Sequence, residues 1–200
     1  MKDIVKRTLV LVGFVLLALG SVACGGPGYM TPLQTPQAVA ADPGQATIVF
    51  IRPSGYGGGR YAILDHNGKF FGELEGESYF VTQVPPGEHT FISWGEGTPA
   101  LKATVEAGKI YYVEMGMTIG AWSARARLFA IGPQRKQWAE LGEWLAESKM
   151  VALSPTGEQA FMQEKGEDVA EVVQKGLANY AEYDAEAREQ RTLTPADGVD

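Results

Sequence analysis

The sequence predicts an antiparallel β-sandwich of seven to eight strands followed by a C-terminal helical appendage. Three observations support this fold class. Between residues 46 and 132, short runs rich in β-branched and aromatic residues alternate with glycine, proline and asparagine. After residue 133 the apolar residues take the spacing of an α-helix. The composition, 45% hydrophobic and 20% charged over 200 residues, is that of a globular chain with one or two small domains.

Residues 1–23 have the layout of a bacterial secretory signal peptide and are excluded from the fold. Lys2, Lys6 and Arg7 make the start of the segment positive, and an apolar run follows over residues 9–23. A transmembrane helix needs about 20 apolar residues, so this run is too short to cross a membrane comfortably. We therefore expect the segment to direct export.

The single cysteine comes directly after this segment. Residues 21–25 (SVACG) resemble the lipobox of bacterial lipoproteins, although Ser21 stands where that family favours leucine. The resemblance implies cleavage before Cys24 and a covalent diacylglycerol and palmitate anchor on its thiol. Gly25 in place of aspartate then favours the outer membrane, with the protein facing the periplasm. The alternative is a soluble periplasmic protein cut near Ala23.

Residues 24–45 are expected to form a lipidated cysteine and a flexible tether. This segment is rich in glycine, proline and glutamine, is almost uncharged, and shows no period of a strand or a helix. A flexible coil of about 20 residues spans roughly 25 Å. Such a tether would hold the next domain just clear of a membrane surface.

Residues 46–132 are predicted to form the β-sandwich. The nearly continuous apolar run 47–52 predicts a central strand, and Leu101, Ala103 and Val105 alternate with polar residues as in a half-buried strand. Asn67-Gly68 suits a hairpin turn. The expected strands cover residues 47–52, 61–65, 69–74, 78–84, 88–94, 101–106, 109–115 and 124–131.

Several short motifs occur in a fixed order over this region. They are FIRP (50–53), LDHNG (64–68), FGEL (71–74), SYF (78–80), VPPGEH (84–89) and AGKIYYVE (107–114). Over about residues 46–117 the set resembles the domain-of-unknown-function 2846 family, a group of prealbumin-like β-sandwich modules in bacterial lipoproteins. The resemblance implies a fold and a location. It implies no reaction, because the family has no assigned chemistry.

Residues 133–191 are predicted to form the helical appendage, and residues 192–200 a disordered tail. A short apolar run at 150–153 suggests one added strand, and Ser154-Pro155 suits the start of a helix through about residue 164. The apolar residues from Val169 to Tyr180 predict a last helix that reaches about Arg191. The helical stripes either pack on the sandwich or dock a partner.

Two groups of residues are candidates for ligand binding. Gly57, Gly58 and Arg60 belong to a glycine-rich loop at one end of the sandwich, where binding residues are often found. The loop lacks the lysine and the following helix of a phosphate-binding loop. Arg125 and Arg127 project from one face of a strand and could bind a carboxylate or phosphate. The alternative is an ordinary solvated loop and strand face.

The sequence predicts no catalytic residue, no metal site and no other cofactor. His66 and His89 are the two histidines, and their spacing relative to Asp65 and Glu88 matches no zinc pattern. Of the four tryptophans, Trp122 is the one expected to be exposed, and the others are expected in the core.

The charge distribution excludes one class of partner. The net charge is −7, and residues 133–200 hold 7 basic and 14 acidic side chains, so no basic stripe for nucleic acid is present. The expected function is that of a membrane-anchored envelope lipoprotein, a non-enzymatic interaction module for an envelope protein or cell-wall partner. The alternatives are a periplasmic module that binds a small ligand, glycan or anion, and a cell-wall hydrolase.

Overall fold

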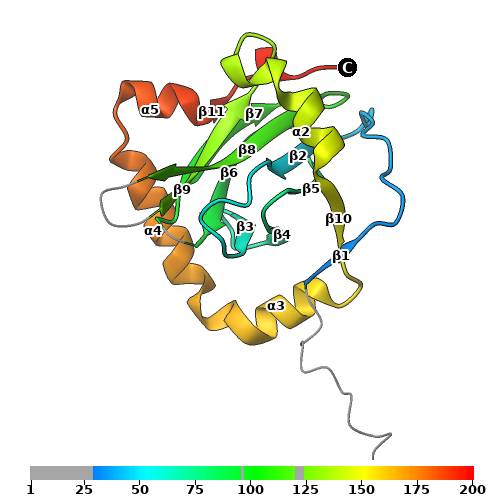
Figure 1. Ribbon diagram of the computed structural model, residues 1–200. Helices are drawn as coiled ribbons and strands as arrows, with labels where there is room; N and C mark the ends of the chain where they lie inside the picture. Colours follow the sequence, from blue (N-terminus) through cyan, green and yellow to red (C-terminus); the bar gives the residue numbers. More distant parts are fainter. Residues whose placement is uncertain (1–28, 96, 120–123) are drawn as a thin grey trace, which may run out of the picture.

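Two β-sheets pack face to face, with helices on their outer sides (Figure 1). The computed structural model describes residues 29–95, 97–119 and 124–200. The expected signal peptide, Cys24 and Trp122 lie outside these ranges. Within the described residues no helix is both long and apolar enough to cross a membrane.

The larger sheet has six strands in the order β1-β10-β5-β2-β8-β9. They are β1 (Met30–Pro32), β2 (Ala46–Arg52), β5 (Ser78–Val84), β8 (Ile110–Ile119), β9 (Ala124–Ile131) and β10 (Lys149–Leu153). All seven residues of β2 are buried, which confirms the prediction of a central strand. This strand pairs antiparallel with β5 and parallel with β8.

The smaller sheet has five strands in the order β11-β7-β6-β3-β4. They are β3 (Tyr61–Asp65), β4 (Phe70–Leu74), β6 (Gly87–Trp94), β7 (Ala100–Val105) and β11 (Thr192–Leu193). In β7 the residues Leu101, Ala103 and Val105 point into the core, and the lysine and threonine between them are exposed, as the alternation predicted.

The described part of residues 46–132 forms eight strands, β2 to β9, at the predicted places, and β10 is the added strand expected at residues 150–153. The short strands β1 and β11 were not predicted, and the prediction that the strands are all antiparallel is wrong. Three pairs are parallel: β2 with β8, β5 with β10 and β7 with β11. Parallel pairing joins segments that are far apart in the chain, and a strand's apolar pattern does not specify the direction of its neighbour.

Aromatic and aliphatic side chains from both sheets fill the space between them. Phe50 of β2 stacks on Phe80 of β5 and meets Phe91 of β6 edge to face, with ring centroids 5.2 and 5.1 Å apart. Such contacts join the two layers, and burial of each ring contributes on the order of 2 kcal/mol. This interior holds the two sheets in a fixed relation.

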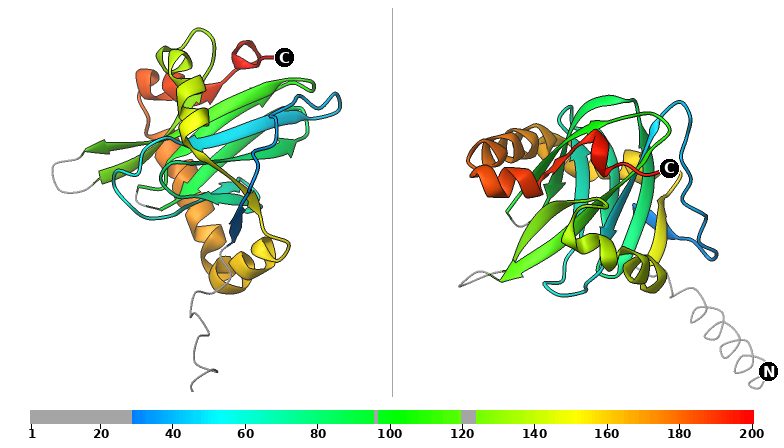
Figure 2. Two further views of the ribbon diagram at one scale, coloured as in Figure 1. Left: turned by 45° about the vertical axis from the view of Figure 1, so that its right-hand side comes forward. Right: turned by 90° about the horizontal axis from the view of Figure 1, so that it is seen from above.

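Helices cover the outer face of each sheet (Figure 2). They are η1 (Lys136–Ala139), α2 (Leu141–Glu147), α3 (Gly157–Lys165), η2 (Gly166–Asp168), α4 (Val169–Ala181), α5 (Ala185–Gln190) and η3 (Pro195–Asp197). Trp138, Leu141 and Trp144 pack on the larger sheet. In α4, Val169, Val173 and Tyr180 pack on the smaller sheet. The apolar faces of α2 and α4 therefore pack on the sheets.

Gly176 explains how closely α4 approaches this sheet. A Cβ at this position would lie 2.5 Å from the Ile92 side chain, so a larger residue would push the helix away. The expected single helix to Arg191 is interrupted after Ala181. Asp184 caps the start of α5, since its carboxylate accepts a hydrogen bond of 2.8 Å from the Ala187 N–H.

The described part of the predicted flexible tether, residues 29–45, is attached to the sandwich. Residues 29–45, here called the N-terminal strap, begin with β1, which pairs antiparallel with β10. The Leu33 N–H also donates to the Met150 carbonyl, and the Thr47 hydroxyl donates to the Ala40 carbonyl. Pairing requires no side-chain period, so the composition of the strap gave no sign of it.

The predicted disordered tail is also ordered. Residues 192–200, here called the C-terminal tail, contain β11, and Leu193 is fully buried in the core between the sheets. Arg135 binds the buried Asp197 carboxylate through two hydrogen bonds of 2.8 and 3.1 Å. The expected appendage also supplies β10 to the larger sheet, so residues 46–132 and the appendage share one sheet.

Candidate functional site

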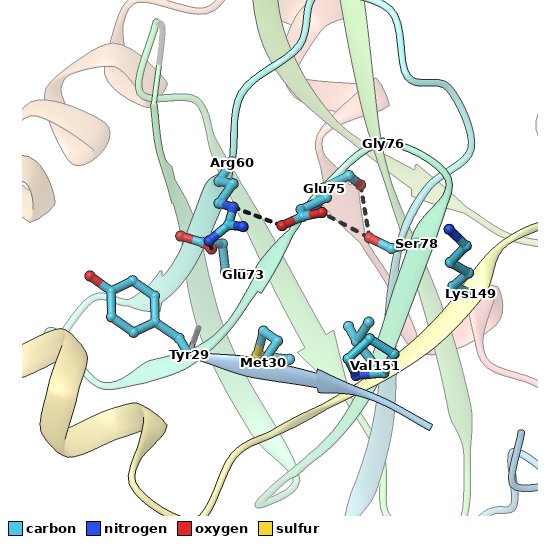
Figure 3. Close-up of a pocket in the computed structure, with 10 residues that line it drawn as sticks. Tyr29, Met30, Arg60, Glu73, Glu75, Gly76, Ser78, Lys149 and Val151 are labelled. Carbon is cyan, nitrogen blue, oxygen red and sulfur yellow. Dashed lines mark hydrogen bonds and ion pairs between the residues drawn. The ribbon is translucent and has the colours of Figure 1, made fainter. Parts of the chain in front are cut away.

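A cavity of about 300 Å³ opens at one edge of the sandwich, where β1 and β10 of the larger sheet lie near β4 of the smaller one. Figure 3 shows its charged side chains arranged above an apolar floor. The lining residues are Tyr29, Met30, Pro32, Arg60, Glu73, Glu75, Gly76, Ser78, Lys149 and Val151. Its size suits a small ligand.

The floor of the cavity depends on a glycine in β4. A Cβ on Gly72 would lie 2.9 Å from the terminal carbon of Met30, so the strap lies directly over this strand because the residue is glycine. Met30 is partly buried and packs against the core between the sheets, as does Val151 of β10. Met30 of β1 and Val151 of β10 therefore form one apolar surface, although the sequence did not predict that these two strands pair.

Two carboxylates share one arginine at the wall of the cavity. The Arg60 Nε lies 2.7 Å from Glu75 Oε1, and its Nη1 lies 3.8 Å from Glu73 Oε1. The Glu73 side chain is 12% exposed, against 59% for Glu75. Burial raises the pKa of Glu73 even though Arg60 acts in the opposite direction. Glu73 is thus a half-buried acid whose nearest cationic partner is 3.8 Å away.

A tight turn connects this pair to Lys149. The Ser78 hydroxyl donates to the Glu75 carbonyl and accepts from the Glu75 N–H, which closes the turn that precedes β5. The Lys149 N–H donates to the Glu77 carbonyl at 2.8 Å, which fixes the start of β10 at the cavity. The Lys149 side chain has no ion pair among the described residues.

Tyr29 forms the side wall where the chain enters the fold. Its ring meets Phe70 and Phe161 edge to face, with centroids 5.8 and 5.4 Å apart. Its hydroxyl donates to the Glu164 carboxylate of α3. Burial, followed by the contact with Glu164, raises the pKa of the Tyr29 hydroxyl. The first described residue is therefore attached to both the smaller sheet and α3.

The glycine-rich loop lies beside the cavity, but its carbonyl groups point inward. The fully buried Arg52 donates to the carbonyl oxygens of Tyr56, Gly58 and Gly59 at 2.6–3.0 Å, and its guanidinium lies 4.8 Å from the centre of the Tyr61 ring. An anion-binding loop needs outward N–H groups. Of the predicted residues Gly57, Gly58 and Arg60, it is Arg60 whose side chain lines the cavity.

Arg125 and Arg127 are not brought to this cavity. They lie on β9, at the opposite edge of the larger sheet from β1 and β10. They alternate with the buried Ala126 and Leu128, so both lie on one face of the strand as predicted, with Arg125 exposed and Arg127 half-buried. The Arg127 Nη1 donates to the Ala126 carbonyl at 3.3 Å. The two predicted groups therefore form two separate surfaces.

The two histidines do come together. His66, Glu88 and His89 line one groove of about 400 Å³ with Lys102 and Thr192. The His89 Nε2 lies 2.7 Å from the Pro85 carbonyl oxygen. Within residues 29–95, 97–119 and 124–200, no three histidine, cysteine or acidic side chains are placed to hold a metal ion.

Sequence reasoning found Arg60 but missed Tyr29, Glu73, Glu75 and Lys149. One signal was available: Glu73 is a charged residue inside the otherwise apolar strand segment FFGEL. Glu75 meets Arg60 across the β3–β4 hairpin. Tyr29 and Lys149 reach the cavity only through the pairing of β1 with β10 and of β10 with β5. No protein-family model matches the chain, and no curated protein matches it. The site is therefore interpreted from its own geometry.

Proposed function

We propose that this chain is a lipid-anchored lipoprotein of the bacterial envelope that acts as a non-enzymatic binding module, with the cavity beside Tyr29 as its binding site. One observation carries the proposal: the first described residue, Tyr29, lines the cavity, and Cys24 precedes it by five residues. Five residues span at most about 18 Å. A lipid on Cys24 would therefore hold the cavity close to the membrane surface.

The ordered strap changes how the anchor would work. With residues 29–45 attached to the sandwich, five residues separate a lipid on Cys24 from Tyr29, in place of a tether of about 20 residues. A short tether restricts the orientations of the domain more than a long one does. The edge of the sandwich formed by β1, β4 and β10 would then face the lipid headgroups.

The lining of the cavity supports binding more than covalent chemistry. It contains no histidine or cysteine, and its serine hydroxyl is engaged with the backbone of the turn. A nucleophile needs a base within hydrogen-bond reach. The charged groups Arg60, Glu73, Glu75 and Lys149 instead suit recognition of a polar ligand.

Two finer assignments belong to the same proposal. We assign the sandwich to the prealbumin-like class and to the domain-of-unknown-function 2846 family, on the order of the motifs from residue 50 to residue 114. We place the protein at the outer membrane facing the periplasm, on the glycine that follows Cys24. A protein partner would have to use a surface other than the apolar stripes of α2 and α4, which pack on the sheets.

Lipid labelling in cells tests the anchor. Cells that express the full chain would be fed a labelled fatty acid, and the protein would be recovered and its label and membrane fraction measured. We expect label on the wild type and none on Cys24→Ala, which should move to the soluble periplasmic fraction. Equal labelling of both proteins, or an unlabelled wild type, would overturn the anchor.

A further inference from the structure

The charges in the cavity are incompletely paired, and this suggests what the cavity binds. We propose that it binds a small zwitterion, whose oxyanion contacts Arg60 and Lys149 and whose ammonium group contacts Glu73. This inference rests on the proposed binding function and names its ligand class. Arg60 and Lys149 carry two positive charges, and Glu73 and Glu75 carry two negative ones. A ligand with both charges leaves the cavity neutral.

The cationic side of the cavity has free donors. A guanidinium carries five N–H donors. Arg60 places its Nε on Glu75 at 2.7 Å, while its Nη1 is 3.8 Å from Glu73, beyond hydrogen-bond distance. Lys149 has no ion pair among the described residues. Figure 3 shows Arg60 and Lys149 on either side of Glu75 and Ser78, and both cations line the same cavity.

The acidic side has a carboxylate that water reaches poorly. Glu73 is 12% exposed, and its ion pair with Arg60 is a long one. A buried charged group without good hydrogen bonds is costly, and a ligand ammonium would supply those bonds. Met30 and Val151 form the apolar floor that a short carbon chain between the two charged groups would cover.

Two sources could provide this chemistry near a membrane. One is the phosphoethanolamine headgroup of a phospholipid, and the other is an amino acid or short peptide. Both combine an ammonium with an oxyanion. The experiment therefore uses glycerophosphoethanolamine and dialanine as probes, each with relatives that lack one charge.

Binding would be measured by calorimetry on the full-length chain in detergent micelles. The single-charge controls are ethanolamine and glycerophosphoglycerol for the first probe, and dialanine amide and N-acetyl-dialanine for the second. We expect at least one zwitterion to bind about 10-fold tighter than both of its controls, which corresponds to one charged hydrogen bond. The better probe identifies the source.

Two variants test the contacts. Glu73→Gln should weaken binding of the zwitterion about 10-fold and leave binding of the anionic control unchanged. Lys149→Gln should weaken binding of the zwitterion and of the anionic control. Glu171→Gln and Lys175→Gln on α4 are the matched controls and should have no effect. Both zwitterions failing to bind, or an anionic control binding as tightly as its zwitterion, would overturn the inference.

These outcomes are independent of the anchor. Loss of lipid labelling with intact zwitterion binding would remove the lipoprotein assignment and leave the ligand class. If the protein were labelled but bound only an anion, and Glu73→Gln did not change that binding, the anchored binding module would stand and the proposal of a zwitterionic ligand would be overturned.

Discussion

The N-terminal strap and the C-terminal tail each add a short strand to the edge of a sheet, but different forces hold them. In the tail, Leu193 is fully buried, and the Asp197 carboxylate is bound by Arg135 and by Thr194. In the strap, β1 is half-buried or exposed, and its contacts are backbone pairing with β10 and the packing of Met30 over Gly72.

The comparison separates structural charge from functional charge. At the tail, a buried carboxylate is fully hydrogen-bonded, so burial of the charge stabilises one conformation. Beside the strap, the half-buried carboxylate of Glu73 on β4 lines an open cavity, and its ion pair with Arg60 is a long one of 3.8 Å. A protein that binds a charged ligand needs the second arrangement, because a fully paired group has nothing left to offer.

The largest expected effect is at the tail. Asp197→Ala should lower the free energy of unfolding by about 3–5 kcal/mol, because it leaves Arg135 partly buried without its partner. Urea denaturation measures this. Burial alone would raise the pKa of Asp197, but the hydrogen bonds from Arg135 and Thr194 outweigh it and leave the pKa lowered. The stability from Asp197 is therefore present at neutral pH and lost as the pH falls through its lowered pKa.

The control for this variant is Asp200→Ala, which breaks the ion pair with Lys109. Asp200 is 93% exposed, and solvent screens its ion pair, so its loss should leave stability nearly unchanged. Equal effects of the two substitutions would show that the tail is not held by its buried pair.

The next effect compares the two added strands directly. Leu193→Ala in β11 should cost about 3 kcal/mol, since the side chain fills the core between the sheets. Met30→Ala in β1 should cost about 1 kcal/mol, since that side chain is partly buried. Chemical denaturation of both variants measures the difference. A larger loss for Met30→Ala would mean that the strap, and not the tail, is the more important edge.

A third effect concerns a carboxylate away from both edges. Glu114 of β8 faces outward between Ile51 and Phe129, and burial, with a smaller contribution from Glu140, raises its pKa to about 7. The folded state therefore favours the protonated acid. The stability associated with this proton is present below about pH 4.5 and lost as the pH rises through about 7.

Glu114→Gln should accordingly stabilise the protein at pH 8 by about 2 kcal/mol and have little effect at pH 4. Thermal denaturation at the two pH values measures the change, with the exposed Glu106→Gln as the control. An equal effect of Glu114→Gln at both pH values would show that ionisation of the Glu114 carboxylate does not cause the change in stability. A positive result would show that the charged form of Glu114 is costly at this position.

The parts of the fold that depend on local pattern were predictable. The buried run of β2, the alternation in β7 and the apolar stripe of α4 each follow from residues close in sequence, and each is present. The pairings of β1, β10 and β11 were not predictable, because strands of two to five residues carry little periodic signal. Two of the three parallel pairs, β5 with β10 and β7 with β11, involve these short strands.

The candidate site was also predictable only in part. Arg60 was selected because a glycine-rich loop precedes it. The carbonyl groups of that loop accept hydrogen bonds from Arg52, which is fully buried at the end of β2. The apolar pattern of β2 gave no indication that this arginine is buried. Glu73 and Lys149 are separated by more than seventy residues and meet through the β4, β5 and β10 region. Long-range pairing, and not residue type, determines which charges share a cavity.

The smallest effect tests the cavity side of the comparison most closely. Glu73→Gln should raise stability at pH 8 by up to about 1 kcal/mol, because burial raises the pKa of Glu73 and its charged form is costly. The gain should vanish at low pH, where the wild-type acid is protonated. Glu75→Gln is the matched control: it removes an exposed ion pair with Arg60 and should lower stability by about 0.5 kcal/mol. Denaturation at both pH values measures whether each substitution raises or lowers the free energy of unfolding. If Glu73→Gln were destabilising at pH 8, Arg60 would already satisfy this carboxylate, and it would have no free capacity for a ligand cation.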